Sequence, residues 1–443
     1  MHCVFFCGFL RLLRSIENHE VNIQLRISSL SVYDSELELE KAKRKRSFLM
    51  NTDPKVLIVT SAFGDGHIKV AEAIDHSFRR RGISRIVTLD LFAAVYPSLN
   101  ELSRRFYLNS TGYTQEFYGL VYKLTSKIKP DQFMGKWIHS MGKRKVQRII
   151  DEIGPDIIIH TFPYLAAAEL ASTKGRRIPL FTVMTDYVVH GRWLHPQTSK
   201  YFIATESMKA ELMSLGIAEE KLVVSGIPIR EAFEQTQERE GLLRKHGLDG
   251  NRHYLLLAAG AYGVLSDINH LIIRALQQSN FDVMVLCGNN HKLQMATEEL
   301  FQENPRVHIR GYTEEMQELM CISSCLLTKA RGITLTEAMA LALPVIVYRP
   351  LPGQEAGNAE WLSEHNLIEI ARNEEQLVEQ LQRLEHLGYR DEKVQDMKNF
   401  SRKSAADAIV TEALEVIKLR QPSVSAVKSM VVEGQAKTIH GYY

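Results

Sequence analysis

Short runs of apolar residues alternate with longer amphipathic stretches along most of this chain. The apolar runs are rich in Val, Ile and Leu, as is typical of parallel strands that are covered on both faces. Helical patterns separate most of them. In the first half the pattern predicts six strands: Val56–Ser61, Ile86–Leu89, Ile157–Thr161, Leu180–Thr185, Tyr201–Ala204 and Val223–Ser225.

A second series of strands starts beyond the turn Gly226-Ile-Pro-Ile-Arg230. Its predicted members are Tyr254–Ala259, Val283–Cys287, Val307–Arg310, Leu326–Thr328, Val345–Tyr348 and Leu367–Ile370. Two consecutive sets of alternating strands and helices imply two doubly wound α/β domains. We place these domains at residues 50–226 and 227–403, followed by a last helix at 404–420 and a loose tail at 421–443.

The first 49 residues show no alternation of strands and helices. They end in a highly charged stretch, Glu36–Arg46, and Met50 stands shortly before the first predicted strand. One hypothesis is that translation starts at Met50 and that residues 1–49 are not part of the protein. The alternative is a genuine flexible arm, and N-terminal mass spectrometry distinguishes the two.

The composition is that of an ordinary globular protein. Hydrophobic residues make up 45% and charged residues 24% of the 443, which excludes a wholly disordered or fibrous chain. The formal net charge of +2 gives no global bias toward nucleic acid. The five cysteines contain no CxxC pair, which fits a reducing compartment, and no apolar run reaches the length of a membrane span. We therefore expect a cytoplasmic protein whose membrane contacts are peripheral.

The first predicted strand runs into the glycine-rich turn Ser61-Ala-Phe-Gly-Asp-Gly66-His67. Glycines let the backbone approach a ligand closely, and the helix that follows offers free N–H groups. Lys69 stands where a dinucleotide fingerprint needs its third glycine, so NAD binding is a weak interpretation. His67 is placed either as a general base or as a structural residue at the helix start.

In the second half, Thr328-Lys-Ala-Arg-Gly-Ile-Thr-Leu-Thr-Glu337 joins a strand to a helix. The N–H groups near Gly332 could hold a diphosphate, and Glu337 could accept hydrogen bonds from ribose hydroxyls. No G-K-[ST] occurs, so this is not a Walker loop. A plain strand-to-helix turn with a capping Thr explains the same residues.

Two further loops carry polar side chains after strands. The turn at Pro352-Gly353 precedes Gln354, Glu355 and Asn358, which suit sugar hydroxyls or a solvated helix start equally well. The other loop carries Asp186, His190, Trp193 and His195, which resemble the wall of a site. A metal site built from Asp186, His190 and His195 is not expected, because histidines five apart do not share a helix face and no cysteine assists them.

Residues 100–150 differ in charge from the rest of the chain. They contain ten Lys or Arg against three acidic residues and are rich in aromatic residues. A basic amphipathic surface with aromatic residues suits an anionic membrane. No nucleic-acid-binding motif accompanies these charges, and a solvated face over an aromatic core is the alternative.

These motifs together resemble a known family. The matching segments are, in order, VLIVTSAFGDGH, PDIIIHTFP, VMTDYVVHGRWLH, VSGIPIRE, AAGAYGVL, GYTEEM and TKARGITLTEAMALALPVIVYRPLPGQEAGNA. From Met50 to about Leu419 the chain resembles the processive diacylglycerol glucosyltransferases of Gram-positive bacteria and the plant monogalactosyldiacylglycerol synthases, of glycosyltransferase family 28.

The resemblance implies a GT-B fold, in which two Rossmann-like domains face a cleft and the last helix crosses back to the first domain. It also implies a UDP-sugar in the C-terminal domain. The uracil would lie by Gly311 and Tyr312, the diphosphate by Gly332, Ile333 and Thr334, the ribose by Glu337, and the sugar by Gln354, Glu355 and Asn358.

For the N-terminal domain the resemblance implies a diacylglycerol site at the membrane. His67 would act as the base, assisted by Asp186. The residues expected on the acceptor or membrane side are Gly66, His190, Trp193, Arg104, Arg105, Lys136 and Trp137.

The implied reaction is the inverting transfer of glucose or galactose from a UDP-sugar to diacylglycerol, repeated on its own product in processive members. The enzyme would act at the inner face of the cell membrane. No D-x-D motif occurs, so neither a metal nor another cofactor is expected. The alternatives are transfer to another lipid and a UDP-sugar-binding membrane sensor without turnover.

Three departures from the family pattern bear on activity. Relatives read Lys-Pro-Gly-Gly-Ile-Thr where this chain has Lys329-Ala-Arg331-Gly332-Ile-Thr334. If the first of those glycines needs a positive φ, Arg331 strains the loop by about 1 kcal/mol or more; alternatively its guanidinium pairs with phosphate. Asp65 replaces an Asn beside His67, and Tyr262 replaces a common His.

Overall fold

The computed structural model describes seven stretches of the chain: residues 53–61, 65–95, 143–163, 165–170, 178–235, 237–259 and 267–420. Several predictions lie outside them, namely those on the N-terminal extension, Arg104, Arg105, Lys136, Trp137, Tyr262 and the tail. Nearly all described residues form one compact unit, Pro54–Arg81 and Arg85 onward. In the other unit, which includes Asp53 and Gly82–Ser84, the Asp53 carboxylate accepts a hydrogen bond from the Ser84 N–H at 2.9 Å.

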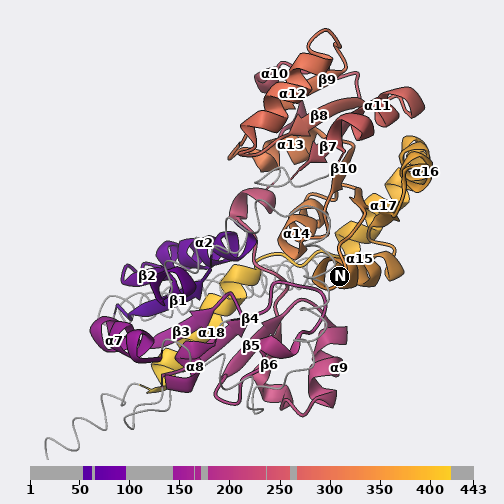
Figure 1. Cartoon of the computed structure of the whole chain (residues 1–443). Helices are drawn as coiled ribbons and strands as arrows, with labels where there is room; N and C mark the ends of the chain where they lie inside the picture. Colours follow the sequence, from indigo (N-terminus) through magenta and orange to yellow (C-terminus); the bar gives the residue numbers. More distant parts are fainter. Residues whose placement is uncertain are drawn as a thin grey trace, which may run out of the picture. The chain divides into compact units, whose positions relative to one another are not determined.

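The first sheet has six parallel strands in the order β2-β1-β3-β4-β5-β6 (Figure 1). The strands are β1 (Val56–Thr60), β2 (Ile86–Asp90), β3 (Ile157–His160), β4 (Leu180–Val183), β5 (Lys200–Ile203) and β6 (Leu222–Val224). Its described helices are α2 (Asp65–Arg80), α3 (Leu91–Val95), α7 (Lys143–Ile153), α8 (Ala166–Leu170) and α9 (Glu206–Ser214). The central strands are buried on both faces, as a parallel sheet between helices requires.

The second sheet is also parallel and six-stranded, in the order β12-β11-β10-β7-β8-β9. Its strands are β7 (Tyr254–Ala258), β8 (Asp282–Leu286), β9 (Val307–Arg310), β10 (Cys325–Thr328), β11 (Val345–Tyr348) and β12 (Glu369–Ala371). The helices are α10 (Arg239–His246), α11 (Ile268–Gln278), α12 (His291–Phe301), α13 (Met316–Ile322), α14 (Gly332–Ala340), α15 (Gln354–Glu364), α16 (Glu374–Glu385) and α17 (Leu387–Phe400).

The last described helix, α18 (Ala405–Arg420), packs against α2 of the first sheet's layer (Figure 1). The Asp407 carboxylate accepts hydrogen bonds from Arg80 at 2.7 and 2.8 Å and from the Ser77 hydroxyl. Arg81 donates to the Thr411 hydroxyl at 2.8 Å. A helix that follows the second sheet in sequence therefore belongs to the core around the first sheet.

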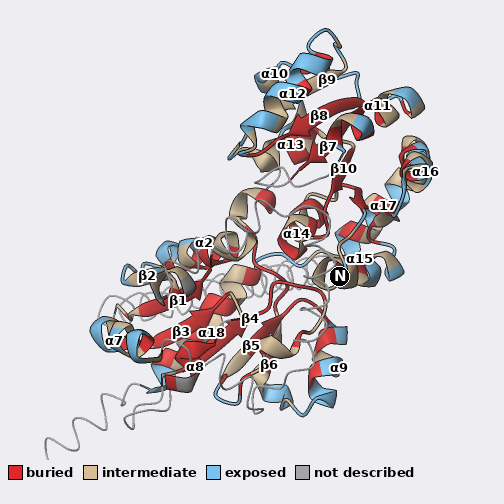
Figure 2. Ribbon diagram, in the orientation of Figure 1, coloured by how far each residue is buried: buried red, intermediate tan, exposed pale blue. Residues whose placement is uncertain are grey.

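The prediction of two doubly wound α/β domains is confirmed, and each of the twelve predicted strands is present to within about two residues. Figure 2 shows the buried strands in red beneath more exposed helices. The expectation of strands covered on both faces is wrong for β2, where Val87 is 40% exposed, because β2 is an edge strand. Among the described residues, no helix is long and apolar enough to cross a membrane.

Each sheet has one place where the direction of strand addition reverses. In the first sheet this point lies between β1 and β3, and in the second between β7 and β10. Loops at the carboxyl ends of two such strands diverge to opposite faces of the sheet, which leaves a crevice suited to ligands. His67, at the start of α2, comes after β1, and the loop before Gly332 follows β10, so both principal motifs stand at these positions.

Candidate active site

His67 is the third residue of α2, the first described helix after β1. Its Nδ1 lies 2.8 Å from the carbonyl oxygen of Thr161, the first residue after β3. A carbonyl can only accept, so Nδ1 carries the proton and Nε2 holds the lone pair. The two loops of the first sheet's switch point therefore set the tautomer that a general base requires.

The surroundings of the His67 ring keep it uncharged. Phe162 meets the ring edge-on, with centroids 5.0 Å apart, and the Trp193 ring lies at 6.2 Å. Burial lowers the pKa of His67 to about 4, and the nearby positive charge of Arg331 acts in the same direction. At neutral pH the imidazole is therefore neutral and able to accept a proton.

The start of α14 approaches the first sheet's loops very closely. A Cβ added to Gly332 would lie 2.2 Å from the Thr185 carbonyl oxygen, and one added to Gly66 would lie 2.6 Å from Cδ1 of Ile333. Real Cβ atoms do not approach backbone oxygen so closely, so Gly332 requires glycine for space. Gly66, next to His67, thus contacts the loop predicted to hold the diphosphate.

Arg331 does not strain this loop. It is the N-cap residue of α14, with φ −84° and ψ 125°, an extended conformation that any residue adopts. The expectation of a positive φ at this position is therefore not met, and the close approach that needs glycine falls on Gly332 instead. Strain at Arg331 therefore gives no reason to expect a sensor without turnover.

Glu337 is a buried carboxyl group near the start of α14, and 7% of the residue is exposed. Among the residues that the structure describes, none forms a hydrogen bond with its carboxylate. Burial raises the pKa of Glu337 to about 7, although the positive charges of Arg230 and Lys69 oppose the shift. A buried acceptor without a partner normally serves a ligand or a water molecule.

Asp186 is held by the amides predicted to contact the sugar. Its Oδ1 accepts from Gln354 Nε2 at 2.6 Å and from Asn358 Nδ2 at 3.0 Å. Burial raises the pKa of Asp186. His67 Nδ1 donates to the Thr161 carbonyl instead, so the structure does not pair Asp186 with the imidazole.

Asn358 is fully buried, and the protein itself uses both ends of its amide. Besides Asp186, Nδ2 donates to the Ala330 carbonyl at 3.3 Å, and Oδ1 accepts from the Tyr187 N–H at 2.9 Å. Nearby, the hydroxyls of Tyr187 and Thr336 lie 2.7 Å apart. Asn358 therefore joins the loop after β4 to the loop after β10, whereas its contact with a sugar stays a prediction.

The remaining predicted donor residues stand at the carboxyl edge of the second sheet. Glu355 accepts from the Leu351 N–H at 3.1 Å, and Tyr312, just after Gly311, is 50% exposed. Lys329 donates to the Arg349 carbonyl at 3.1 Å, and burial lowers its pKa against the opposing charge of Glu355. Thr334 lies in the first turn of α14. These groups share one sheet edge because the strands are parallel.

His190 and His195 stabilise local turns. Nδ1 of His190 accepts from the Arg192 N–H, and Nδ1 of His195 accepts from the Gln197 N–H, both at 3.1 Å. Each Nδ1 thus accepts a hydrogen bond from the backbone two residues further along the chain. The two histidines and Asp186 do not form a metal-ligand cluster among the described residues.

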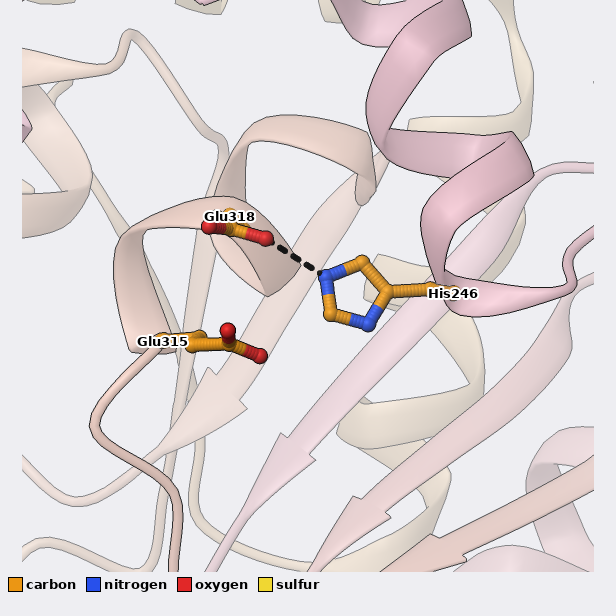
Figure 3. Close-up of side chains that lie close together, drawn as sticks. All are labelled: His246, Glu315 and Glu318. Carbon is orange, nitrogen blue, oxygen red and sulfur yellow. Dashed lines mark hydrogen bonds and ion pairs between the residues drawn. The ribbon is translucent and has the colours of Figure 1, made fainter.

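One group of side chains has the spacing of a metal site. His246, Glu315 and Glu318 place ligand atoms within 4.8 Å of one another, and His246 Nε2 lies 2.8 Å from Glu318 (Figure 3). The Lys245 ammonium group already binds both carboxylates, at 2.8 Å to Glu315 and 2.7 Å to Glu318. The cluster is therefore an ion-pair network, centred on Lys245, that joins α10 to α13.

Sequence reasoning missed several residues that shape the site. Thr161 and Thr185 hold His67 and crowd Gly332, while Arg230 and Lys69 face Glu337. Thr161 and Thr185 are the last residues of two predicted strands, and the carboxyl end of a strand is itself a signal in a parallel sheet. Arg230 stands in the family segment VSGIPIRE at the start of the second predicted domain, but it does not directly follow a predicted strand, so the strand pattern gave no role for it.

Comparison with known proteins identifies the family. Residues 67–229 match the model of the monogalactosyldiacylglycerol (MGDG) synthases, and residues 269–404 match that of the group 1 glycosyl transferases. A processive diacylglycerol β-glucosyltransferase of Bacillus cereus is 34% identical over 392 residues, covering 88% of this chain and 97% of its own. The Bacillus cytotoxicus protein is 33% identical over the same coverage. This chain belongs to their family.

Solved structures agree with the GT-B fold. MurG of Acinetobacter baumannii has a TM-score of 0.55 at 15% identity, covering 82% of this chain and 100% of its own. The UDP-GlcNAc 2-epimerase of Neisseria meningitidis has a TM-score of 0.53 at 16% identity, covering 81% and 99%. Because proteins named for different reactions share this fold, the family and not the fold identifies the chemistry.

Proposed function

We propose that this glycosyltransferase moves glucose from UDP-glucose to diacylglycerol with inversion, and that His67 is the general base. The observation that carries the proposal is the neutral imidazole at the first sheet's switch point, with Nδ1 bound to Thr161 and Nε2 left to accept. Gly66, its neighbour, contacts the start of α14. The names of the relatives support both the donor sugar and the lipid acceptor.

The proposed reaction is a single displacement. The acceptor hydroxyl gives its proton to Nε2 of His67 while its oxygen attacks the anomeric carbon on the face opposite UDP. The bond from that carbon to the phosphate oxygen breaks, and UDP leaves with the electron pair. One displacement on an α-linked donor yields a β-linked product, which agrees with the β-glucosyltransferase name of the relatives.

Negative charge grows on the diphosphate as UDP leaves. We place it at the amino end of α14, where the N–H groups of Gly332, Ile333 and Thr334 are not used within the helix. Lys329 and Arg331 belong to the same loop and supply positive charge without a metal ion. Gln354 and Glu355 are the proposed contacts to the sugar, and Glu337 is the proposed acceptor for ribose hydroxyls.

The acceptor is a membrane lipid, so we propose that the protein binds the inner face of the cell membrane as a peripheral protein. Residues 100–150 contain ten basic and three acidic residues, and this excess of positive charge suits an anionic surface. A product that remains in the membrane stays close to the enzyme. Repeated transfer onto that product is the processive behaviour that the relatives' names describe.

The proposal is tested by incubating the purified protein with labelled UDP-glucose or UDP-galactose and vesicles that contain diacylglycerol. We expect labelled β-glucosyldiacylglycerol from UDP-glucose, at a rate that a chelator does not change. Label that appears only with another lipid acceptor supports the alternative of transfer to that lipid. UDP binding without any labelled lipid supports the sensor hypothesis and contradicts turnover.

A further inference from the structure

A pocket with a volume of about 250 Å³ lies at the amino-terminal edge of the second sheet. Its lining includes the residues just before three strands: His253 before β7, Ser324 before β10 and Pro344 before β11. In a parallel sheet the amino ends of the strands all lie opposite the carboxyl ends. The pocket is therefore separate from the proposed donor site, which occupies the carboxyl edge.

The lining of this pocket is basic. Arg239 of α10 and Arg390 of α17 contribute guanidinium groups, and no carboxylate is among the lining residues. In the described part of the chain, neither guanidinium forms an ion pair with a carboxylate. Arg239 donates one hydrogen bond, to the Ile322 carbonyl at 3.2 Å, which leaves most of its five N–H donors available.

The positive charges act on His253. Its pKa is lowered by partial burial and then by Arg390 and Arg239, while Glu385 opposes the shift. Both guanidinium groups therefore lie near the imidazole. Nδ1 of His253 and the Ser324 hydroxyl are 3.1 Å apart, so polar groups able to contact an anion accompany the two charges.

We propose that this pocket binds a phosphate group, either of a small soluble phosphate compound or of a lipid headgroup. Two guanidinium groups with a neighbouring hydroxyl provide the forked and single donors that phosphate oxygens accept. The volume is smaller than is usual for sites that hold drug-sized ligands, so a nucleotide is not expected. The proposal is independent of the transferase activity.

The pocket also touches the helix that carries the donor loop. Leu341 to Pro344, which follow α14, form part of its wall, and α14 begins at Gly332 on the other edge of the sheet. α17, which carries Arg390, packs against α14. A phosphate group bound by Arg390 therefore stabilises the position of α14, and we expect it to change the affinity for UDP.

Isothermal titration with inorganic phosphate and with glycerol 3-phosphate, at constant ionic strength, tests the proposal on the full chain. We expect saturable binding that weakens at least tenfold in Arg390→Gln and further in the Arg239→Gln, Arg390→Gln double variant. Arg244→Gln, which removes an exposed arginine of α10 outside the lining, should bind as the wild type does. Circular dichroism and denaturant unfolding establish that each variant is folded.

Cosedimentation with vesicles distinguishes the two sources of the phosphate group. Retention that increases with phosphatidic acid and depends on both arginines identifies a headgroup. Binding of the soluble phosphates without that dependence identifies a soluble ligand. The proposal is overturned if no saturable binding occurs in either arm, or if the double variant binds both probes as tightly as Arg244→Gln does.

Discussion

The two switch points of this molecule differ in whether the protein itself forms hydrogen bonds with their key side chains. At the first, His67 is held by the Thr161 carbonyl and packed between aromatic rings. At the second, Glu337 is buried, yet no described residue donates a hydrogen bond to it. The difference agrees with the two roles that we propose, because a base must be oriented before substrate arrives, whereas a binding carboxylate gains its partners from the ligand.

Replacement of His67 should produce the largest effect and tests the first half of this contrast. In His67→Ala we expect the rate of transfer to fall about 10²- to 10⁴-fold, because the base is lost. UDP affinity should stay within about twofold. His76→Ala on the same helix, where the imidazole is exposed, is the matched control. Loss of UDP binding in His67→Ala would contradict the division of tasks.

Replacement of Glu337 tests the second half. Without the carboxylate, Glu337→Ala should bind UDP about tenfold or more weakly, since charged hydrogen bonds contribute roughly 1.5–3 kcal/mol. Glu364→Gln, exposed on α15, is the control. Unchanged UDP affinity in Glu337→Ala would remove the ribose from the assigned site.

The pKa of Glu337, about 7, adds a dependence on pH. The ionised form is the better acceptor, and protonation increases as pH falls through 7. UDP affinity should therefore fall severalfold between pH 8 and pH 6 in the wild type, and stay flat over this range in Glu337→Gln. Titration calorimetry at each pH measures both, and an equally steep fall in the variant would assign the effect to another group.

Two glycine substitutions test the contact between the switch points. Gly332→Ala forces a Cβ onto the Thr185 carbonyl and should lower the free energy of unfolding by about 1–3 kcal/mol. In Gly66→Ala the new methyl group meets only the end of the Ile333 side chain, which can move. This variant should therefore lose less free energy of unfolding. Gly388→Ala, with open space around it, is the control in denaturant unfolding. Equal losses for Gly66 and Gly332 would contradict this grading.

Replacement of Asp186 tests whether its carboxylate positions Gln354 and Asn358 or assists His67. If Asp186 positions Gln354 and Asn358, Asp186→Asn keeps an acceptor oxygen and should change the rate less than about threefold. Asp186→Ala should raise KM for the donor about tenfold with a smaller change in kcat. A large fall in kcat in Asp186→Asn, with KM unchanged, would instead support the predicted assistance to His67.

Arg331→Gly should have the smallest effect on stability. Because Arg331 is extended at φ −84°, glycine relieves no strain there, and its greater freedom in the unfolded chain costs about 0.5–1 kcal/mol. The rate of sugar transfer should therefore not increase in Arg331→Gly. Arg331→Lys keeps the positive charge, so its rate shows how much that charge contributes to transfer. A faster Arg331→Gly enzyme in the labelled-donor assay would restore the strain argument.

Much of the fold could be predicted because it follows from local patterns. Buried parallel strands need continuous apolar runs, so the strands appeared in the sequence nearly at their observed bounds, as at Val345–Tyr348. The loops after β1 and β10 were also recognisable, because glycine and polar residues stand where apolar strands end. Resemblance to a family then named the chemistry of those loops.

The partners of Asp186 and His67 could not be read from local patterns. Asp186 lies 168 residues before Gln354, and only the packing of loops from both sheets places their side chains 2.6 Å apart. In the same way, the pairing of His67 with Thr161 depends on β1 and β3 being neighbours in the sheet, although 94 residues separate the two side chains.

The order of residues was thus sufficient to define twelve strands, two α/β domains and the loops that carry the candidate chemistry. It did not define which side chain holds which, or the pKa that results. Secondary structure and burial patterns depend on neighbours along the chain, whereas hydrogen bonds, steric limits such as that at Gly332, and desolvation of groups such as Glu337 depend on neighbours in space. Those neighbours exist only once the sheets have formed and their loops have met.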